Sequence, residues 1–479
     1  MNEAVNGKVK NIMDFSNWIF WFIVLPYIVV LGKVSRIFSG GSASENISKW
    51  GLSVLSCVLL AVISVETLLI FLFVSLLAYV VCRASLQASR RGKTIVLALL
   101  IPVLLLPLIY YKYADFVASD VLGRKWDTFH DLVIPVGISF YSFQIVSFCV
   151  DTLRSNQRIP KFVDYMNFCS FFPQMVAGPI ERRENLLPQM ESWRANLKGS
   201  NLADGLPYII LGLFFKLTLA DNLASAMAIG YCGENAFQIW INNVAFGFRI
   251  YFDFAGYGLS AYGVARCLGV HIIMNFMSPY TSCNVTEFWR KWHISLTHWF
   301  RDYIYFSLGG SRTRFWWFNI IFMFLVSGVW HGAGWNFIIW GGLAGVTMVI
   351  HRLFRNMQKK LPPMIGWGLT FGVMMFIWMF FYETDMTIIR KNFCAIVDWH
   401  NYDFIEFLNS MYIEKRKAAM LCLFLTLSFF AILIEYISLR RTPENPYRLH
   451  ISPIGCGIMT FLMVVLHNSI QNSFIYFAF

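Results

Sequence analysis

Long apolar segments recur along the whole chain, and short polar loops separate them. A helix that crosses a bilayer needs about 20 apolar residues. Backbone polar groups in lipid must be paired within their own segment, which favours helices over any open structure. The pattern therefore predicts an all-α integral membrane protein, a single polytopic membrane domain over 1–479 with roughly 11 membrane helices. The apolar segments run approximately through 18–34, 52–81, 94–111, 132–150, 205–220, 237–254, 256–273, 315–332, 334–350, 365–381, 418–437 and 454–470.

Two of the apolar stretches have an ambiguous pattern. The stretch 52–81 has Glu66 near its centre. It fits one long tilted helix or two half-length helices. The stretch 171–180 reads FFPQMVAGPI, so two prolines and a glycine interrupt it. Irregular backbone at membrane depth requires protein or a water-filled cavity around it. A re-entrant or buried segment and a loop at the membrane surface both remain open for this stretch.

Composition and charge support the membrane assignment. Apolar residues make up 57% of the chain and charged residues 14%, against about 25% charged in an average soluble domain. These numbers exclude a disordered chain and a coiled coil. The net charge of +12 fits basic loops that hold spans in place by the positive-inside rule, so we expect membrane lipids and no nucleic acid as partners. The same rule predicts that loops 83–93, 351–363 and 439–449 are cytoplasmic.

The segment 284–310 has a different, amphipathic pattern. Asn284 followed by Glu287 resembles a capping box, and Gly309-Gly310 is a typical helix stop. The spacing predicts one helix with an aromatic stripe and a polar stripe, lying at the interface or lining a wet cavity. Membrane anchoring explains its cations, but it does not require histidines. The aromatic stripe is Trp289, Trp292, Leu296, Trp299 and Tyr303; the polar positions include Arg290, His293, Thr297, His298 and Arg301.

A third histidine, His331, lies in a strongly apolar stretch with glycines at 328, 332 and 334. Ionisable groups within membrane segments face a cavity or a partner. A neutral imidazole can take a proton from a hydroxyl, which suits hydroxyl attack on an activated acyl group. A histidine that only bonds neighbouring helices is the alternative.

Metal and redox chemistry have little support in the sequence. The pair His293 and His298 is spaced i+5 and diverges on a helix, and no HExxH pattern is present. None of the ten cysteines forms a CxxC pair. We therefore expect no metal site.

Several sequence blocks, in order, resemble the membrane-bound O-acyltransferase family. The likeness is strongest over 90–350 and is nearest to the bacterial polysaccharide branch typified by alginate O-acetyltransferase. The order of the blocks and the presence of both histidines make the resemblance specific. The blocks are GISFYSFQ at 137–144, FFPQMVAGPI at 171–180, IYFDFAGY at 250–257, EFWRKWHISL at 287–296, RDYIY at 301–305, LGGSR at 308–312, SGVWHG at 327–332 and FIYFAF at 474–479.

The resemblance implies a fold and a chemistry. The fold is a bundle of membrane helices, with re-entrant or interfacial helices, around a central tunnel that 284–310 would line or cap. His331 matches the family's catalytic histidine and His293 the second histidine of the bacterial branch. An acetyl group would pass from acetyl-CoA, or from a carrier-protein thioester, to hydroxyls of an extracytoplasmic polysaccharide. The donor is a co-substrate, and no permanently bound cofactor is expected. Further candidate binding residues are Arg290, Trp292, His298, Trp330 and Arg312.

The resemblance also implies a location and a partner. Relatives in this branch lie in the bacterial cytoplasmic (inner) membrane, and a separate exported acyltransferase often receives the acyl group. The segment 257–263 and the terminal Phe-Ala-Phe depart from the alginate pattern, which leaves the substrate open. D-alanyl transfer to teichoic acid and peptidoglycan O-acetylation are the alternatives within the family. A lipid or glycan transporter, which paired broken helices would favour, and a non-catalytic scaffold are the alternatives of another class.

Overall fold

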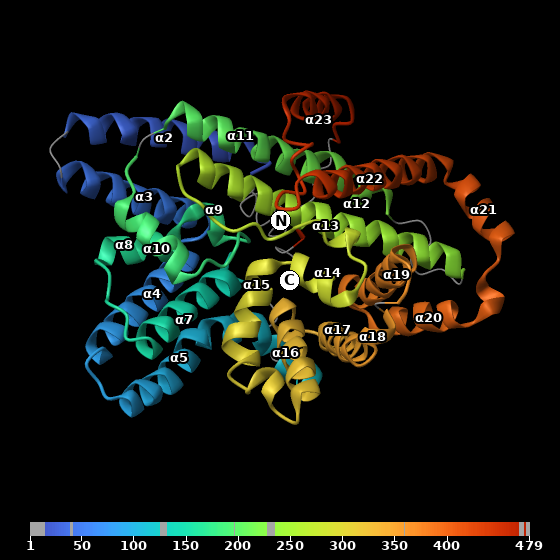
Figure 1. Ribbon diagram of the computed structural model, residues 1–479, viewed down its shortest axis with the longest axis horizontal. Helices are drawn as coiled ribbons and strands as arrows, with labels where there is room; N and C mark the ends of the chain where they lie inside the picture. The colour runs from blue at the N-terminus through green and yellow to red at the C-terminus, as the bar shows by residue number, and fades with distance from the viewer. Residues whose placement is uncertain are drawn as a thin grey trace. The chain divides into compact units, whose positions relative to one another are not determined.

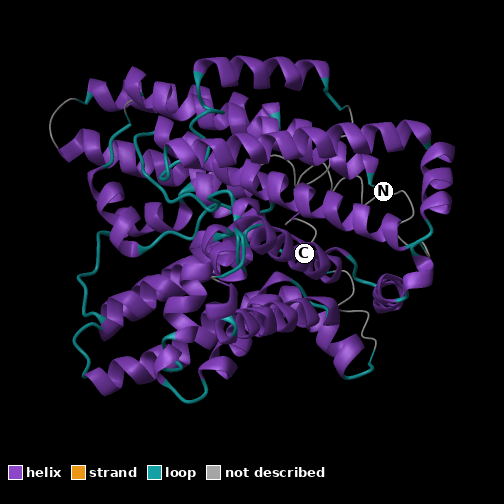
Figure 2. Cartoon of the chain, turned by 45° about the vertical axis from the view of Figure 1, so that its right-hand side comes forward, coloured by secondary structure: helices purple, strands orange, loops and turns teal. Residues whose placement is uncertain are grey.

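The computed structural model describes residues 15–38, 42–124, 132–195, 197–227, 235–358, 360–468, 474 and 475. Within these ranges every regular element is a helix and no strand is present (Figure 2). Contacts within the chain group into two compact units. The first holds the described residues up to Ile209 together with Tyr257–Met274, and the second holds Ile210–Gly256 together with the described residues from Asn275 onward. The prediction of a single polytopic domain stays a prediction.

Apolar helices packed side by side build the first unit (Figure 1). Helix α5 contains Pro102 and Pro107 and continues into a π-helical turn, Val117–Val121. The helices of this unit are α2 (Trp18–Ile37), α3 (Ser42–Ile63), α4 (Val65–Ser85), α5 (Arg90–Phe116), α7 (Ile138–Arg154), α8 (Phe162–Ser170), α9 (Phe172–Met175), α10 (Arg183–Ser192) and the first part of α11 (Gly199–Leu213).

The stretch 52–81 belongs to two helices, as one of the two alternatives proposed, but both are full-length rather than half-length. Helices α3 and α4 meet at Ser64. The Ser64 hydroxyl oxygen accepts a hydrogen bond from the Thr67 amide at 3.2 Å, which starts the second helix. Glu66 then lies in the first turn of α4, where the helix dipole favours a negative charge. Periodicity alone could not place this break because both sides of it are apolar.

The interrupted stretch 171–180 is buried along its whole length. Gly137 holds it closely: a Cβ added there would lie 2.5 Å from the Met175 carbonyl oxygen. The side-chain nitrogen Nε2 of Gln174 donates to the Phe168 carbonyl oxygen at 3.0 Å. The blocks 137–144 and 171–180 therefore pack together inside the first unit. This burial supports the buried segment, and whether the stretch lies at the membrane surface stays open.

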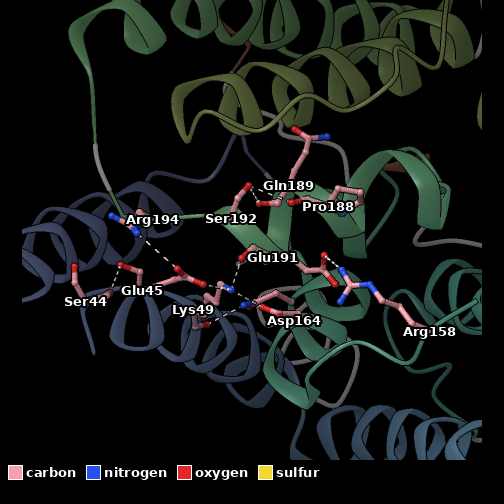
Figure 3. A network of polar contacts seen from close by, with 12 residues as sticks. Ser44, Glu45, Lys49, Arg158, Asp164, Pro188, Gln189, Glu191, Ser192 and Arg194 are labelled. Carbon is pink, nitrogen blue, oxygen red and sulfur yellow. Dashed lines mark hydrogen bonds and ion pairs between the residues drawn. The ribbon is translucent and has the colours of Figure 1, made fainter. Parts of the chain in front are cut away.

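A buried lysine joins three helices of the first unit (Figure 3). Lys49 on α3 is only 2% exposed. Its ammonium group lies 2.6 Å from Glu45 Oε1 and 2.9 Å from Asp164 Oδ1 on α8, and it also donates to the Glu191 carbonyl oxygen on α10. A buried cation requires this many partners, because an unpaired charge away from water is very unfavourable. The network therefore fixes α8 and α10, which flank the stretch 171–180.

The second unit contains the elements that carry the candidate chemistry. Segments 237–254 and 256–273 are predicted as two spans, but they lie mainly on one continuous helix, α13 (Ala236–Cys267), of which the residues up to Gly256 belong to this unit and those from Tyr257 to the first. No proline interrupts that helix. The other helices of this unit are α12 (Asp221–Ala226), α14 (Val285–Lys291), α15 (Ile294–Phe300), α16 (Trp316–His331), α17 (Trp335–Leu353), α18 (Arg355–Gln358), α19 (Pro363–Tyr382), α20 (Met386–Val397), α21 (Phe404–Ile413), α22 (Lys415–Arg441) and α23 (Pro453–Val465).

Eight of the described helices are long and apolar enough to cross a membrane. Two further apolar helices, α16 and α23, are shorter. The helical composition agrees with the predicted fold class. The eight candidate spans are Trp18–Ile37, Ala43–Ile63, Val65–Ser85, Arg90–Val121, Gly199–Ala226, Trp335–Leu353, Pro363–Tyr382 and Lys415–Arg441.

Candidate active site

The segment 284–310 is not one continuous helix, which corrects the prediction. Asn284 caps α14 as expected: its Oδ1 accepts from the Glu287 amide at 2.8 Å. The helix then ends at Lys291, His293 adopts a left-handed backbone conformation, and α15 begins at Ile294. The stripe pattern is that of a single helix, so periodicity gave no sign of the break. Whether this segment lies at a membrane interface stays a prediction.

The break at His293 brings its imidazole into an aromatic environment. His293 is 2% exposed. Its ring lies edge-on to Phe254, with ring centres 4.6 Å apart, and 6.0 Å from the ring of Trp330. Burial lowers the pKa of the imidazole from its usual 6.5 to about 3, because desolvation disfavours the charged form. His293 is therefore neutral at physiological pH.

His331 is the last residue of α16 and is 4% exposed. Its ring centre lies 4.8 Å from that of Trp330, 4.9 Å from that of Trp340 and 5.2 Å from that of Phe381. Trp330 therefore contacts both histidine rings. The three aromatic side chains leave little space around the imidazole and fix its orientation.

Glycines let the two helices around His331 approach closely, as their positions in the sequence suggested. A Cβ added at Gly328 would lie 2.2 Å from the Phe337 carbonyl oxygen of α17. One added at Gly341 would lie 2.4 Å from the Phe324 carbonyl oxygen of α16. Separations below 3 Å do not occur for real Cβ atoms, so both positions require glycine. The backbones of α16 and α17 therefore pack in close contact near His331, the last residue of α16.

His293 and His331 line one small cavity, which we call the histidine pocket. Its volume is about 30 Å³, enough for a water molecule. Two histidines that lie 38 positions apart in the sequence thus meet at the same space. The other lining residues are Trp289, Trp292, Leu296, Thr297, Phe300, Met323, Phe324, Ser327 and Trp340.

A much larger cavity adjoins the histidine pocket, and we call it the arginine chamber. Its volume is about 890 Å³. The two cavities share four lining residues: Trp289, Thr297, Met323 and Phe324. The two cavities therefore lie next to each other, with these four side chains between them. Its lining includes Arg290, Arg301, Arg352, Arg355 and His351.

The charge of the arginine chamber is strongly positive. The described lining includes one carboxylate, Glu287, and Lys291 Nζ already pairs with it at 2.7 Å. Arg301 is itself paired with Asp302, with Nε 2.7 Å from Oδ1, so Arg290, Arg352 and Arg355 carry the net positive charge. All four arginines are exposed. Guanidinium groups bind phosphates through paired hydrogen bonds, so this surface suits a phosphorylated ligand.

The structure brings together most, but not all, of the residues selected from the sequence. His293, His331, Trp292 and Trp330 are buried around the histidine pocket, and Arg290 lines the arginine chamber. His298 is half-buried and Arg312 is exposed, and neither is among the residues that line the two cavities. The binding roles of all these residues stay predictions.

Several residues of the site were not selected from the sequence. Trp340 and Phe381 contact His331 from apolar helices, where nothing distinguishes them from ordinary core residues. Arg352 and Arg355 line the chamber, although we had interpreted them only as part of a basic cytoplasmic loop. The available sequence signal was the position of these two arginines directly after the two glycine-containing apolar segments 315–332 and 334–350. Among the described residues, no group of three or more His, Cys, Asp or Glu is placed to hold a metal ion.

Comparison with known proteins identifies the family to which this site belongs. The model of the membrane-bound O-acyltransferase family matches residues 124–384, more than half of the chain. The chain belongs to the membrane-bound O-acyltransferase family. It is an O-acyltransferase and an integral membrane protein. His293, His331 and the described lining of both cavities fall within the matched residues.

Relatives within this O-acyltransferase family have different named activities. The chain is 34% identical over 310 residues to the peptidoglycan O-acetyltransferase of Helicobacter pylori, covering 57% of this chain and 59% of that protein, less than two thirds of its length. It is 30% identical over 451 residues to a probable alginate O-acetylase of Pseudomonas putida, with 90% of each chain covered. It is 29% identical over 246 residues to the teichoic acid D-alanyltransferase of Bacillus subtilis, covering 48% of this chain and 62% of that protein.

Proposed function

We propose that the protein moves an acetyl group from acetyl-CoA, on the cytoplasmic side of a bacterial inner membrane, to hydroxyls of an extracytoplasmic polysaccharide. The observation that carries this proposal is the shared histidine pocket, which adjoins a large arginine-lined chamber. The relatives named as alginate O-acetylase and peptidoglycan O-acetyltransferase support acetyl as the transferred group.

In this proposal His331 acts as the general base. Its neutral imidazole takes the proton of the attacking hydroxyl while the hydroxyl oxygen bonds to the acetyl carbonyl carbon. The carbon–sulfur bond of the thioester then breaks, and the imidazolium returns the proton to the leaving thiolate. The products are the acetyl ester and free CoA. A variant of this scheme, in which His331 carries the acetyl group transiently, remains an alternative.

His293 assists rather than accepts the proton in this scheme. Its imidazole is neutral, and one of its ring nitrogens carries a hydrogen that can donate to the acetyl carbonyl oxygen. A donor at that position stabilises the negative charge that develops on the oxygen as the hydroxyl attacks. The ring contacts with Phe254 and Trp330 limit how far the imidazole can turn.

The arginine chamber is the proposed site for the phosphates of the donor. Acetyl-CoA carries several phosphate charges, and Arg290, Arg352 and Arg355 supply positive charge in the lining beside Arg301, which Asp302 pairs. A phosphopantetheine thioester on a carrier protein would also present a phosphate, so the chamber accommodates either donor. An exported partner acyltransferase could receive the acetyl group on the far side; this expectation rests on the resemblance to the polysaccharide branch.

Membrane vesicles of the two orientations test the donor and its side. Inverted vesicles supplied with [¹⁴C]acetyl-CoA should transfer label to polysaccharide, whereas right-side-out vesicles should not until they are permeabilised. The His331→Ala protein should transfer none. A parallel assay supplies a carrier protein that carries [¹⁴C]D-alanine. Transfer of label from this donor, with none from acetyl-CoA, would refute acetyl transfer and favour the activity named for the Bacillus subtilis relative. Label confined to peptidoglycan would keep acetyl transfer but replace the acceptor.

A further inference from the structure

The backbone of His293 needs external support. Its φ of 41° and ψ of 56° lie in the left-handed region, which is unfavourable for a residue with a Cβ. Such conformations persist only where the surrounding structure holds them, and they cluster at functional sites. The question is therefore which residues hold this turn.

Three hydrogen bonds from one loop hold the chain on both sides of His293. The Met277 amide donates to the Lys291 carbonyl oxygen at 3.0 Å. The Ile294 amide donates to the Asn275 carbonyl oxygen at 2.9 Å, and the Ser295 amide donates to Asn275 Oδ1 at 3.3 Å. The loop thus bonds to the last residue of α14 and to the first two residues of α15.

Asn275 acts as a helix cap that comes from outside the helix. The first amides of an α-helix have no partner within it and need an external acceptor. The His293 side chain makes no capping hydrogen bond to α15. Asn275 satisfies two of these amides, one with its backbone and one with its side chain. Its side chain therefore helps to decide where α15 begins.

A buried polar network holds the loop itself. The Tyr447 hydroxyl donates to the Phe276 carbonyl oxygen at 3.1 Å. Next to it, the Tyr251 hydroxyl donates to Glu435 at 2.8 Å from Oε1, and the two tyrosine oxygens are 3.5 Å apart. Tyr251, Glu435 and Tyr447 are each fully buried.

The loop also contacts the imidazole directly. The Phe276 ring stacks parallel to the ring of His293, with ring centres 6.5 Å apart and planes inclined by 12°. The same ring packs edge-on against Trp292 at 5.1 Å. A displacement of residues 275–277 would therefore move the backbone and the ring of His293 together.

We propose that Asn275 is a positioning residue that keeps His293 in the histidine pocket, and that Tyr447 supports it through Phe276. The inference rests on the proposed function of His293. The stripe pattern of 285–300 favours a continuous helix, as the sequence itself suggested. Without the Asn275 side chain we expect the chain to relax toward that helix, which turns the imidazole away from the pocket that it shares with His331.

Kinetics of Asn275 variants in lipid nanodiscs test the proposal. Asn275→Leu should lower kcat for release of CoA from acetyl-CoA by about tenfold to a hundredfold, as expected when a reacting group is displaced by about 1 Å. The KM for acetyl-CoA should stay within about twofold, because the arginine chamber is unchanged. Asn275→Asp keeps an oxygen acceptor and should restore most of the rate.

A matched control separates positioning from general loss of stability. Asn222 is also buried in the second unit, and its side-chain nitrogen Nδ2 donates to the Leu466 carbonyl oxygen at 3.2 Å. Asn222→Leu should lower the unfolding temperature without the selective fall in kcat. Where Asn275→Leu does not fold, Tyr447→Phe removes a single hydroxyl and should give the same selective fall, to a smaller extent.

A chemical readout separates this inference from the proposed function. Diethyl pyrocarbonate should modify His293 at least severalfold faster in Asn275→Leu than in the wild type, as measured by mass spectrometry of the peptide. Unchanged kcat together with unchanged modification of His293 would overturn the inference. A wild-type protein that releases no CoA from acetyl-CoA would overturn the proposed function instead, and the modification rate alone would then decide the inference.

Discussion

The two histidines of the pocket are positioned in different ways. His331 ends a helix and is fixed by Trp330, Trp340 and Phe381. His293 depends on a backbone turn that residues distant in the sequence hold. The sequence pattern suggested His331 because an ionisable group in an apolar stretch is unusual, and His293 because membrane anchoring does not require a histidine in the polar stripe; the family resemblance implied a role for both. The sequence pattern could not show that the two meet, since this depends on the break in the helix.

The low pKa of His293 gives a prediction for the pH profile. Burial lowers this pKa to about 3, so the imidazole stays neutral throughout the range from pH 5 to 8. An acid limb in kcat within that range must then belong to another group. His293→Gln should lower kcat, by about tenfold or more, and leave the midpoint of the limb unchanged. Steady-state rates of the wild type and of His293→Gln from pH 5 to 8 measure the midpoint of this limb. A midpoint that differs by a full pH unit between the two proteins would contradict a neutral His293.

The arginines of the chamber give a prediction for donor binding. Arg355→Gln removes one positive charge from the lining and should raise the KM for acetyl-CoA severalfold while kcat changes little. The dependence of KM on ionic strength should also weaken, because screening acts on charge pairs. Arg441→Gln is the matched control, since Arg441 is exposed and is not among the residues lining the chamber. Equal KM values for the two variants would contradict a role of Arg355 in binding the donor.

At the scale of elements, the sequence predicted helices well and their interruptions poorly. The apolar segments identify most helices because burial in lipid or protein requires them. The break at His293 and the continuity of α13 were missed, and the break at Ser64 was only one of two alternatives for 52–81. Where a helix breaks depends on a local capping residue or on a hydrogen bond from another part of the chain. The spacing of hydrophobic residues shows neither of these.

Packing of α16 on α17 gives a prediction at the same scale. Gly328→Ala places a methyl group 2.2 Å from the Phe337 carbonyl oxygen, so the two helices must separate. Overpacking of this kind typically costs about 1–3 kcal/mol, and the shift would also displace His331. Gly342→Ala on α17 meets its nearest atom at 3.6 Å and should be tolerated. Unfolding temperatures and acetyl transfer are measured for both variants in detergent, and both quantities should be lower for Gly328→Ala. Equal values for the two variants would show that α16 and α17 need not approach closely at Gly328.

At the scale of the whole molecule, the fold class and family followed from the sequence, and the proximity of the two cavities did not. Composition and the ordered blocks sufficed for a helical membrane O-acyltransferase. The arginine chamber required the structure, because its arginines come from two regions far apart in the sequence, Arg290 with Arg301 and Arg352 with Arg355. Arg312, which the sequence suggested for the same role, lies outside the chamber lining.

The central claim is that His331 and His293 carry out acyl transfer in one pocket. The acetyl content of extracytoplasmic polysaccharide, measured in cells with matched membrane levels of each variant, tests it most directly. His331→Ala should abolish acetylation and His293→Ala should lower it strongly. His450→Ala, which alters another buried histidine of the second unit outside both linings, should largely retain it. Unchanged acetylation in both pocket variants would contradict the account.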